Sequence, residues 1–439
     1  MSRPFALTNA SVVVGDREGS TLSETTVVVN GAGMIENIGP SSELDVPSGY
    51  RQIDLSGRFV LPGLINAHAH LFSNGKPLPP LLTSESAENL VAGFMRSFIG
   101  KRVVKKRART NILTQLNSGV TTLRSLGDVG YEAVEVRNEI ERGDYLGPRV
   151  FASGPLLAIS GGHGAPQIAL ISDSPWEARR NVRINLRAGT TAIKISATGG
   201  VTDARAIGEA GRPQMTEEEM TAICEEAHNA GIVVAAHAQS PEGLKAALRA
   251  GVDTIEHGSS MDQEIIELFK HNPRSLHGSS ALIPTLQACL PLVKLEQQVT
   301  GIDDIVRANA EMIYEEMLQG IQTARDNDIT IGMGTDSALT YVTHYNTWRE
   351  MDYVVRYGGL STAAELHAAT EANARILGID QETGSVRIGK AADLLVVGSN
   401  PLTGFRALAD PQLVIVRGEI IEQPKTEKYP ELDEKLDSF

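Results

Sequence analysis

The chain has 439 residues, of which 41% are hydrophobic and 21% are charged, and its formal net charge is −14. This composition is typical of a globular protein and excludes a disordered or fibrous chain. The negative charge argues against a general binder of nucleic acid or of anionic membranes, because both kinds of binding rely on Lys and Arg.

Residues 1–58 predict short strands separated by turns. The segments "ASVVVGD", "TTVVVNGAGMIENIGP" and "RQIDLSGRFVLPG" are β-branched runs interrupted by Gly, Asn, Asp and Pro.

Residues 59–384 alternate between strand and helix patterns. The apolar run "LPGLINAHAHLF" carries His68 and His70, and seven further candidate strands cover residues 120–128, 148–159, 191–200, 232–239, 253–260, 280–286 and 329–338. Helical segments lie between them, such as "SPWEARRNVRINLRAG" and "SPEGLKAALRAG", and several end in the Gly that commonly terminates a helix. Others begin at a Ser or Thr followed by Glu in the first turn, as in "TEEE" from Thr216. Eight strand–helix units predict an α/β fold with a (β/α)8 TIM-like barrel rather than an open doubly wound sheet.

Residues 385–439 return to strand patterns, in "GSVRIGKAADLLVVGSNP" and "PQLVIVRGEII", before a charged tail that we expect to be peripheral. Strands at both ends of the chain predict a small β domain assembled from residues 1–58 and 385–439, beside a barrel formed by residues 59–384.

Polar residues occur at the carboxyl ends of five candidate strands, which is where a barrel builds its active site. They are His68, His70, Lys194, His237, His257 and Asp336. Strand alternation puts His68 and His70 on one face and points Lys194 into the barrel. A single buried His is more often a hydrogen-bonded core residue than a ligand, but chance convergence of all six is improbable.

Two further histidines follow strands at the same end of the barrel. His163 lies in "SGGHGAP" and His344 in "THYNTWRE", and each could either contact a substrate or serve only the structure. We interpret the remaining four, His228, His271, His277 and His367, as structural or surface residues.

Imidazoles and a carboxylate suit Zn²⁺ and similar divalent ions, with Mn, Co and Fe as alternatives. A Lys ammonium repels cations, but its neutral amine can react with CO₂ to form an anionic carbamate that bridges two metals. Burial of Lys194 favours that neutral amine.

The motifs "PGLINAHAHL", "IKISATGG", "AAHA", "IEHG" and "GTDS", in this order, resemble the amidohydrolase superfamily over essentially the whole chain. The resemblance implies that the terminal strands form a β-sandwich and that the enzyme binds two divalent metals. His68, His70 and Asp336 would hold one metal, His237 and His257 the other, and the Lys194 carbamate would bridge them. Asp336 would act as general base and then general acid for a water activated by the metals.

Within the superfamily, the Lys194 motif is similar to the binuclear, carboxylated-lysine members. "SGGHG" and "KISATGGV" resemble the Xaa-Pro dipeptidase (prolidase-like) branch, and imidazolonepropionase-related proteins share the outline. One departure is "AHAQS", with Gln239 and Ser240 where that branch often has "AHAHG". His237 is kept, but the second His is absent, which leaves the substrate class open.

These features predict a metal-dependent hydrolase of a C–N amide bond in a dipeptide or N-acyl amino acid. A cyclic amide, a lactone or a xenobiotic amide is the alternative substrate, and a non-catalytic scaffold is a remote alternative, since all six ligands are retained. We expect a small-molecule substrate, no nucleic acid or membrane partner, and a homo-oligomer.

The compartment is predicted from what the sequence lacks. Cys224 and Cys289 cannot form a disulfide framework and have no zinc–thiolate spacing around them. The first residues lack a signal-peptide core, and no apolar run approaches the roughly 20 residues that span a bilayer. We therefore expect a cytoplasmic protein.

Overall fold

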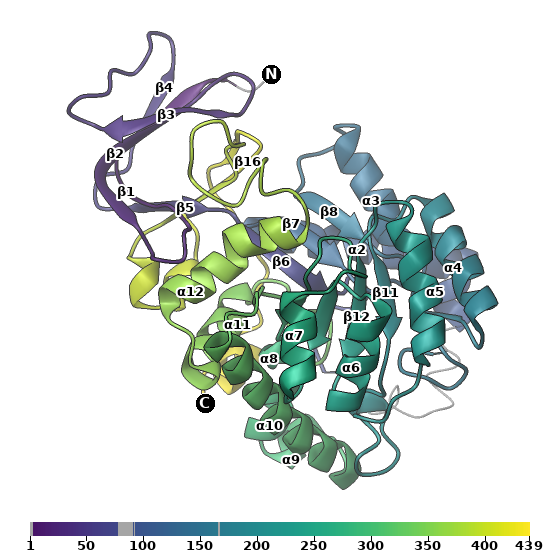
Figure 1. The fold of residues 1–439 in the computed structure, drawn as a ribbon. Helices are drawn as coiled ribbons and strands as arrows, with labels where there is room; N and C mark the ends of the chain where they lie inside the picture. Colours follow the sequence, from purple (N-terminus) through teal and green to yellow (C-terminus); the bar gives the residue numbers. More distant parts are fainter. Residues whose placement is uncertain (1–2, 78–90, 92, 166) are drawn as a thin grey trace.

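The computed structural model describes residues 3–77, 91, 93–165 and 167–439. One part is a sheet built from both ends of the chain, and the other is a larger body of parallel strands surrounded by helices (Figure 1). The architecture is therefore mixed α/β.

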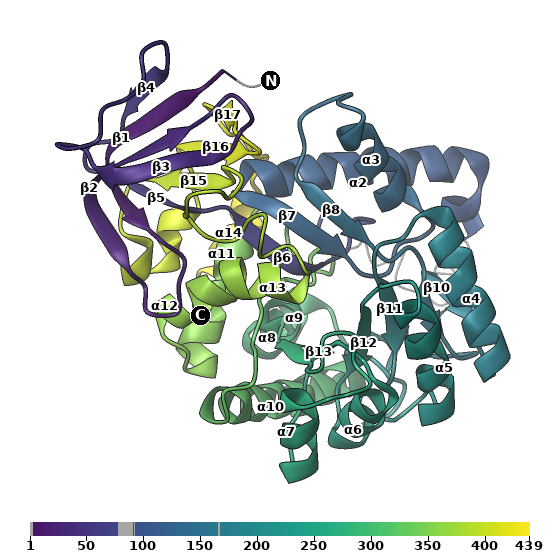
Figure 2. The ribbon, with the colours of Figure 1, turned by 45° about the horizontal axis from the view of Figure 1, so that its top comes forward.

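The terminal sheet has eight strands in the order β17-β16-β15-β5-β1-β2-β3, and β4 also pairs with β1. In Figure 2 the N-terminal strands lie beside the C-terminal ones. Strand β5 joins the two groups, since it runs antiparallel to β15 and parallel to β1. The strands are β1 Phe5–Val13, β2 Thr21–Val29, β3 Ile35–Pro40, β4 Arg51–Asp54, β5 Phe59–Pro62, β15 Leu394–Val397, β16 Leu413–Val416 and β17 Glu419–Ile421.

Alternation along these strands divides their side chains between two cores. Leu394, Val396 and Ile415 pack with Phe5 and other side chains inside the terminal sheet. Their neighbours Leu395, Val397, Val414 and Val416 instead join a core shared with the helices of the larger part. The terminal sheet is thus fastened to the larger part by its second face.

The larger part contains two sheets in which every pairing is parallel. The first is β6-β7-β8 and the second is β10-β9-β11-β12-β13-β14. Their strands are β6 Leu64–Ala69, β7 Val120–Ser125, β8 Arg149–Ala152, β9 Leu156–Ala158, β10 Ala169–Ile171, β11 Ile193–Ser196, β12 Val234–Ala238, β13 Thr254–His257 and β14 Ala281–Ile283.

Hydrogen bonds connect these two sheets at both margins. On one side the N–H of Thr191, just before β11, donates to the carbonyl of Ala152 in β8 (2.8 Å). On the other side, segment 329–338 makes parallel bridges from Ile331 to β14 and from Ser337 to β6. That segment makes only isolated bridges and is not the continuous strand expected from the sequence, and near its end Asp336 and Ala338 adopt left-handed backbone.

The helices confirm the end signals read from the sequence. Helix α5 begins with a capping box between Thr216 and Glu219, and α4 and α6 end at left-handed Gly189 and Gly251. The α-helices after β6 are α2 Phe98–Asn117, α3 Glu132–Glu141, α4 Pro175–Ala188, α5 Glu217–His228, α6 Pro241–Ala250, α7 Gln263–Lys270, α8 Leu286–Lys294, α9 Gln297–Thr300, α10 Asp304–Asp326, α11 Thr347–Tyr353, α12 Thr362–His367, α13 Asn373–Ile376 and α14 Pro430–Leu436. Short 3₁₀ helices cover Val201–Asp203, Pro401–Thr403 and Phe405–Leu408, and π-helical turns cover Val354–Gly358 and Ala368–Ala372.

The charged C-terminal tail is anchored, which corrects the expectation that it is peripheral. Leu432 and Leu436 of α14 are buried in a cluster with Tyr341. The Asp433 carboxylate accepts hydrogen bonds from Tyr345 and Asn346, which follow Asp336 in the chain. Charged residues on one side of α14 concealed the two leucines that dock it.

Within the described part of the chain, no helix combines the length and the apolar character needed to cross a membrane.

Candidate metal centre

The six side chains that the sequence predicts as metal ligands lie together near the carboxyl ends of the parallel strands. His68 lies in β6 and His70 directly follows it, Lys194 lies in β11, His237 in β12, His257 ends β13, and Asp336 lies in segment 329–338. All six are buried, His70 being the most exposed at 8%. Pairwise contacts separate five of them into two groups, and Lys194 belongs to neither group.

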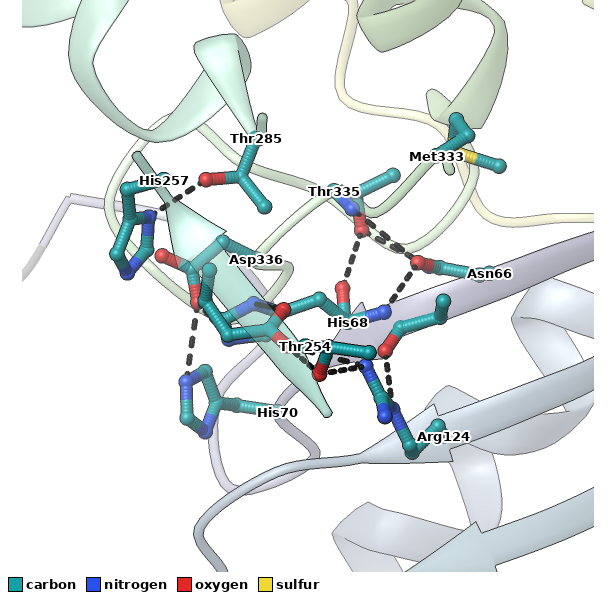
Figure 3. Close-up of polar contacts among 12 residues, drawn as sticks. Asn66, His68, His70, Arg124, Thr254, His257, Thr285, Met333, Thr335 and Asp336 are labelled. Atoms are coloured by element: carbon teal, nitrogen blue, oxygen red, sulfur yellow. Dashed lines mark hydrogen bonds and ion pairs between the residues drawn. The ribbon is translucent and has the colours of Figure 1, made fainter. Parts of the chain in front are cut away.

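The first group is His68, His70 and Asp336, whose ligand atoms all lie within 4.8 Å of one another. Asp336 Oδ1 is 3.1 Å from His68 Nε2 and 3.0 Å from His70 Nε2. Figure 3 shows the two imidazoles approaching the carboxylate from β6 and from the residue after it. Three donors from two distant parts of the sequence thus face one point and could hold a metal ion.

The protonation states of this group favour a shared cation. His70 Nδ1 is 3.0 Å from the carbonyl of Gly127, which can only accept, so Nδ1 carries the proton and Nε2 presents a lone pair. His68 Nε2 and Asp336 Oδ1 are buried without a hydrogen-bond partner among the described residues. Lone pairs that face each other in a buried site are costly unless a cation lies between them.

Backbone geometry aims Asp336 at the histidines. Asp336 has a φ of 56°, a left-handed conformation, and its N–H donates to the carbonyl of His68 (2.8 Å). Gly334 lets the segment approach this closely, because a Cβ there would lie 2.6 Å from the Cβ of His68. Burial raises the pKa of Asp336, but the proximity of His68 and His70 outweighs this effect and holds the pKa well below its usual value.

The second group is His237 and His257, whose ring centroids are 4.5 Å apart. His237 Nε2 donates to the carbonyl of Gly199 (2.9 Å), which leaves Nδ1 as the lone pair. His257 Nδ1 is 2.7 Å from the hydroxyl of Thr285, which leaves Nε2 free. Burial lowers the pKa of both histidines well below the usual value, so both are neutral and able to bind metal at pH 7.

Lys194 interacts electrostatically with both groups. Its Nζ is buried and has no hydrogen-bond partner among the described residues. Burial lowers the pKa of Lys194 to about 8, although Glu256 and Asp336 attract its charge and act in the opposite direction. A minor fraction of the amine is therefore neutral at pH 7, and this fraction grows as the pH approaches 8.

His163 lies at the edge of the site. Its ring stacks on His237 with centroids 4.1 Å apart, and its Nδ1 is 2.5 Å from Asp203 Oδ2. Its side chain is 24% exposed. His163 is thus held in place beside the second group with one edge accessible.

His344 is bonded on both sides. Its Nε2 is 2.7 Å from the carbonyl of Ser73, and its Nδ1 is 3.2 Å from Gln115 Nε2. Burial lowers the pKa of His344 to about 4. A substrate contact through this ring would require one of these bonds to break.

Sequence reasoning missed the buried residues behind the histidines. Glu256 Oε2 is 2.7 Å from His68 Nδ1, and Arg124 contacts the other oxygen of Glu256. The charged Glu256 inside the apolar run "DTIEHG" was the sequence signal that could have revealed them.

The backbone of His257 explains how neighbouring residues reach different sites. Strand alternation would place Glu256 and His257 on opposite faces. His257 has a φ of 71°, which ends the extended strand and frees its ring from that alternation.

Gln239 and Ser240 stand where the prolidase-like branch often has His and Gly, and the structure explains the role of Ser240. Ser240 is the N-cap of α6 and accepts the N–H of Gly243. Gln239 is buried, and its Oε1 has no hydrogen-bond partner among the described residues.

Comparisons with known proteins identify the family and several similar chains. The model of the Amidohydrolase family matches residues 59–421. A crystal structure from Bifidobacterium longum, provisionally named a prolidase, is 49% identical, with a TM-score of 0.88 over 100% of this chain and 99% of that one. A Xaa-Pro dipeptidase with methionine bound in its active site is 27% identical, with a TM-score of 0.79 over 95% and 100%. The ochratoxinase of Aspergillus niger is 28% identical over 405 residues, which cover 85% of this chain and 78% of that protein.

Proposed function

Because the chain belongs to the amidohydrolase family, we propose that it is a metal-dependent hydrolase that cleaves an amide C–N bond. The observation that carries this proposal is the meeting of His68, His70 and Asp336 around one buried point, where His68 Nε2 and Asp336 Oδ1 have no hydrogen-bond partner among the described residues. The neutral histidine pair and the unpartnered amine of Lys194 beside them support a second metal.

Two divalent ions, with Zn²⁺ as the first candidate, fit the donors present. His68, His70 and Asp336 would hold one ion, His237 and His257 the other, and a carbamate on Lys194 would bridge them. The carbamate is favoured because Lys194 is buried without a partner and its pKa is lowered to about 8. Bound in this way, the metals would supply an activated water and polarise the scissile carbonyl.

The protein's own residues would move the proton and orient the substrate. Asp336 is ionised at neutral pH, so it can take a proton from the attacking water and return it to the departing amine. His163, held by Asp203, would donate to a carbonyl or carboxylate of the substrate. His344 is the weaker candidate for a substrate contact, because both ring nitrogens are already bonded.

The proposed substrate is a dipeptide or an N-acyl amino acid. Likeness to the Bifidobacterium longum protein and to the Xaa-Pro dipeptidase supports this class. The ochratoxinase match supports a second candidate, a xenobiotic amide. A cyclic amide or a lactone is a further alternative within the same chemistry.

We also propose that the parallel strands form one closed (β/α)8 barrel. The ring would be β6, β7, β8, β11, β12, β13, β14 and segment 329–338, joined at both margins by the bonds described above. The proposed domain division is residues 59–384 for the barrel, with residues 1–58 and 385–439 forming a β-sandwich to which β5 contributes. Cytoplasmic location and homo-oligomerisation stay predictions, to be tested by fractionation and light scattering.

Metal content and a substrate panel test the proposal. Protein purified without chelator should contain about two divalent metals per chain by mass spectrometry. It should hydrolyse at least one of a panel comprising Xaa-Pro dipeptides, N-acyl amino acids, ochratoxin, lactones and cyclic amides. Metal-free protein would count heavily against the proposal, and bound metal without turnover on any substrate would favour a scaffold.

The variant Lys194→Ala tests the carbamate separately. Its turnover should be lost and then partly restored by added acetate or propionate, which can occupy the place of the carbamate. The matched control is Lys245→Ala, because Lys245 is a surface residue that pairs with Asp262. Equal loss of activity in both variants, or no loss in Lys194→Ala, would contradict the assigned role.

A further inference from the structure

A chain of buried charged groups crosses the interior beneath His68. Arg124, in β7, is the largest of the fully buried side chains. Its Nε donates to the carbonyl of Ala67, the residue before His68 (2.7 Å), and its Nη2 donates to Thr254 Oγ1 (3.2 Å) and Glu256 Oε1 (3.1 Å). Figure 3 shows Arg124 below the strand of His68, bonded to Thr254. One guanidinium therefore ties β6, β7 and β13 together.

Glu256 divides its two oxygens between separate tasks. Oε1 accepts Arg124 and the hydroxyl of Thr254 (2.6 Å). Oε2 lies at ion-pair distance from His68 Nδ1 (2.7 Å), although neither atom has a partner in hydrogen-bond geometry among the described residues. The carboxylate thus lies between the guanidinium on one side and the imidazole on the other.

A purely structural role does not account for this arrangement. The free-energy cost of removing two charges from water offsets much of the attraction between them in a buried ion pair. Apolar residues of similar volume therefore often stabilise a core as well or better. Tying three strands together also needs only Oε1 of Glu256, whereas Oε2 faces the ring whose other nitrogen is directed at Asp336. A carboxylate behind a metal-bound imidazole fixes the ring orientation and makes the imidazole a better ligand.

We propose that Glu256 is a positioning residue that holds His68 with Nε2 turned toward Asp336, and that Arg124 and Thr254 hold Glu256 in place. This inference rests on the metal site proposed above. It concerns the affinity of one of the two metal positions and not the chemical step itself.

Titration of chelator-treated protein with CoCl₂ tests the inference, with binding followed by equilibrium dialysis and coordination by visible absorption. Wild type should bind two equivalents. Glu256→Gln should keep one equivalent at the wild-type Kd and bind the other roughly 10- to 100-fold more weakly, with a changed visible spectrum. Thr254→Val, which removes one hydrogen bond to Glu256, should weaken the same equivalent by a few-fold.

Two further variants separate positioning from folding. Arg124→Met combined with Glu256→Gln removes both charges together, so no unpaired charge stays buried, and it should lose the same equivalent while staying folded by circular dichroism. Glu264→Gln, which breaks an exposed pair with Arg249, is the matched control and should leave both Kd values unchanged.

The possible outcomes distinguish this inference from the proposed function. A folded Glu256→Gln protein, or a folded double variant, that binds both equivalents with wild-type Kd values and spectrum would overturn the inference alone. Wild-type protein that binds no Co²⁺ would overturn the metal site and the inference with it.

Discussion

Replacing Lys194 with Met should remove function and increase stability. The ammonium of Lys194 is buried without a hydrogen-bond partner among the described residues, and its pKa is lowered from 10.5 to about 8. A pKa lowered this far corresponds to about 3 kcal/mol of unfavourable free energy whenever both the folded and unfolded states carry the proton. Methionine fills a similar volume without the charge, so metal-free Lys194→Met should be more stable than wild type by up to that amount.

The pH dependence has a definite sign. Between pH 8 and 10.5 the unfolded state binds more protons at this lysine than the folded state does, so wild-type stability rises with pH. The advantage of Lys194→Met is therefore fully present below pH 8 and is lost as the pH approaches 10.5.

Urea unfolding at pH 7 and pH 10, in chelator and bicarbonate-free buffer, measures the advantage of Lys194→Met. Lys245→Met is the surface control and should change stability by less than about 0.5 kcal/mol. A Lys194→Met protein that is less stable than wild type at pH 7, or whose advantage is the same at both pH values, would refute the burial argument.

Three other predictions concern the metal site and its edge. Removing metal should lower Tm by ~3 °C for each ion released, since saturation of one site at 100 times Kd contributes about 2.7 kcal/mol and a chain of this length unfolds with an entropy near 0.9 kcal/mol/K. Scanning fluorimetry with and without chelator would measure the shift, and an unchanged Tm would argue against a buried cation. Burial keeps the pKa of His237 and His257 well below the usual 6.5, so Co²⁺ should stay bound as the pH falls through 6.5 and leave only at clearly lower pH. Dialysis at a series of pH values would measure this, and release of Co²⁺ near pH 6.5 would contradict it. His163→Asn should raise KM about tenfold or more with metal content unchanged, whereas His344→Gln should lower Tm and leave KM nearly constant; the opposite pattern in steady-state kinetics would exchange their roles.

Sequence patterns predicted the elements that carry the clustered polar side chains, because most of these elements are short, apolar strands that end near a polar residue. Alternation correctly placed Ile193 and Ile195 in the core beneath the helices and left Lys194 on the other face. Capping residues likewise located the ends of α4, α5 and α6. These signals are local: each depends on a few adjacent residues and can be read without knowledge of tertiary contacts.

The supporting residues could not be predicted in the same way. Arg124 and Glu256 are 132 positions apart in the sequence, and only the closing of β7 toward β13 brings them into contact. The left-handed backbone at His257 and Asp336 reflects tertiary contacts, since neither is glycine, the residue that favours this region. Docking of α14 depends on two leucines within a charged segment, which no local pattern distinguishes from a solvated tail.

The contact between Gly334 and His68 links two positions that are far apart in the chain. As sequences diverge, residues 68 and 334 cannot drift independently, because any side chain at 334 displaces β6 or the imidazole it carries. Under the proposed metal site, a glycine at the matching position in another member of the family would accompany the same arrangement of ligands, even where its histidines are hard to align. Another residue in place of this glycine would identify family members in which the proposed metal site has changed or been lost.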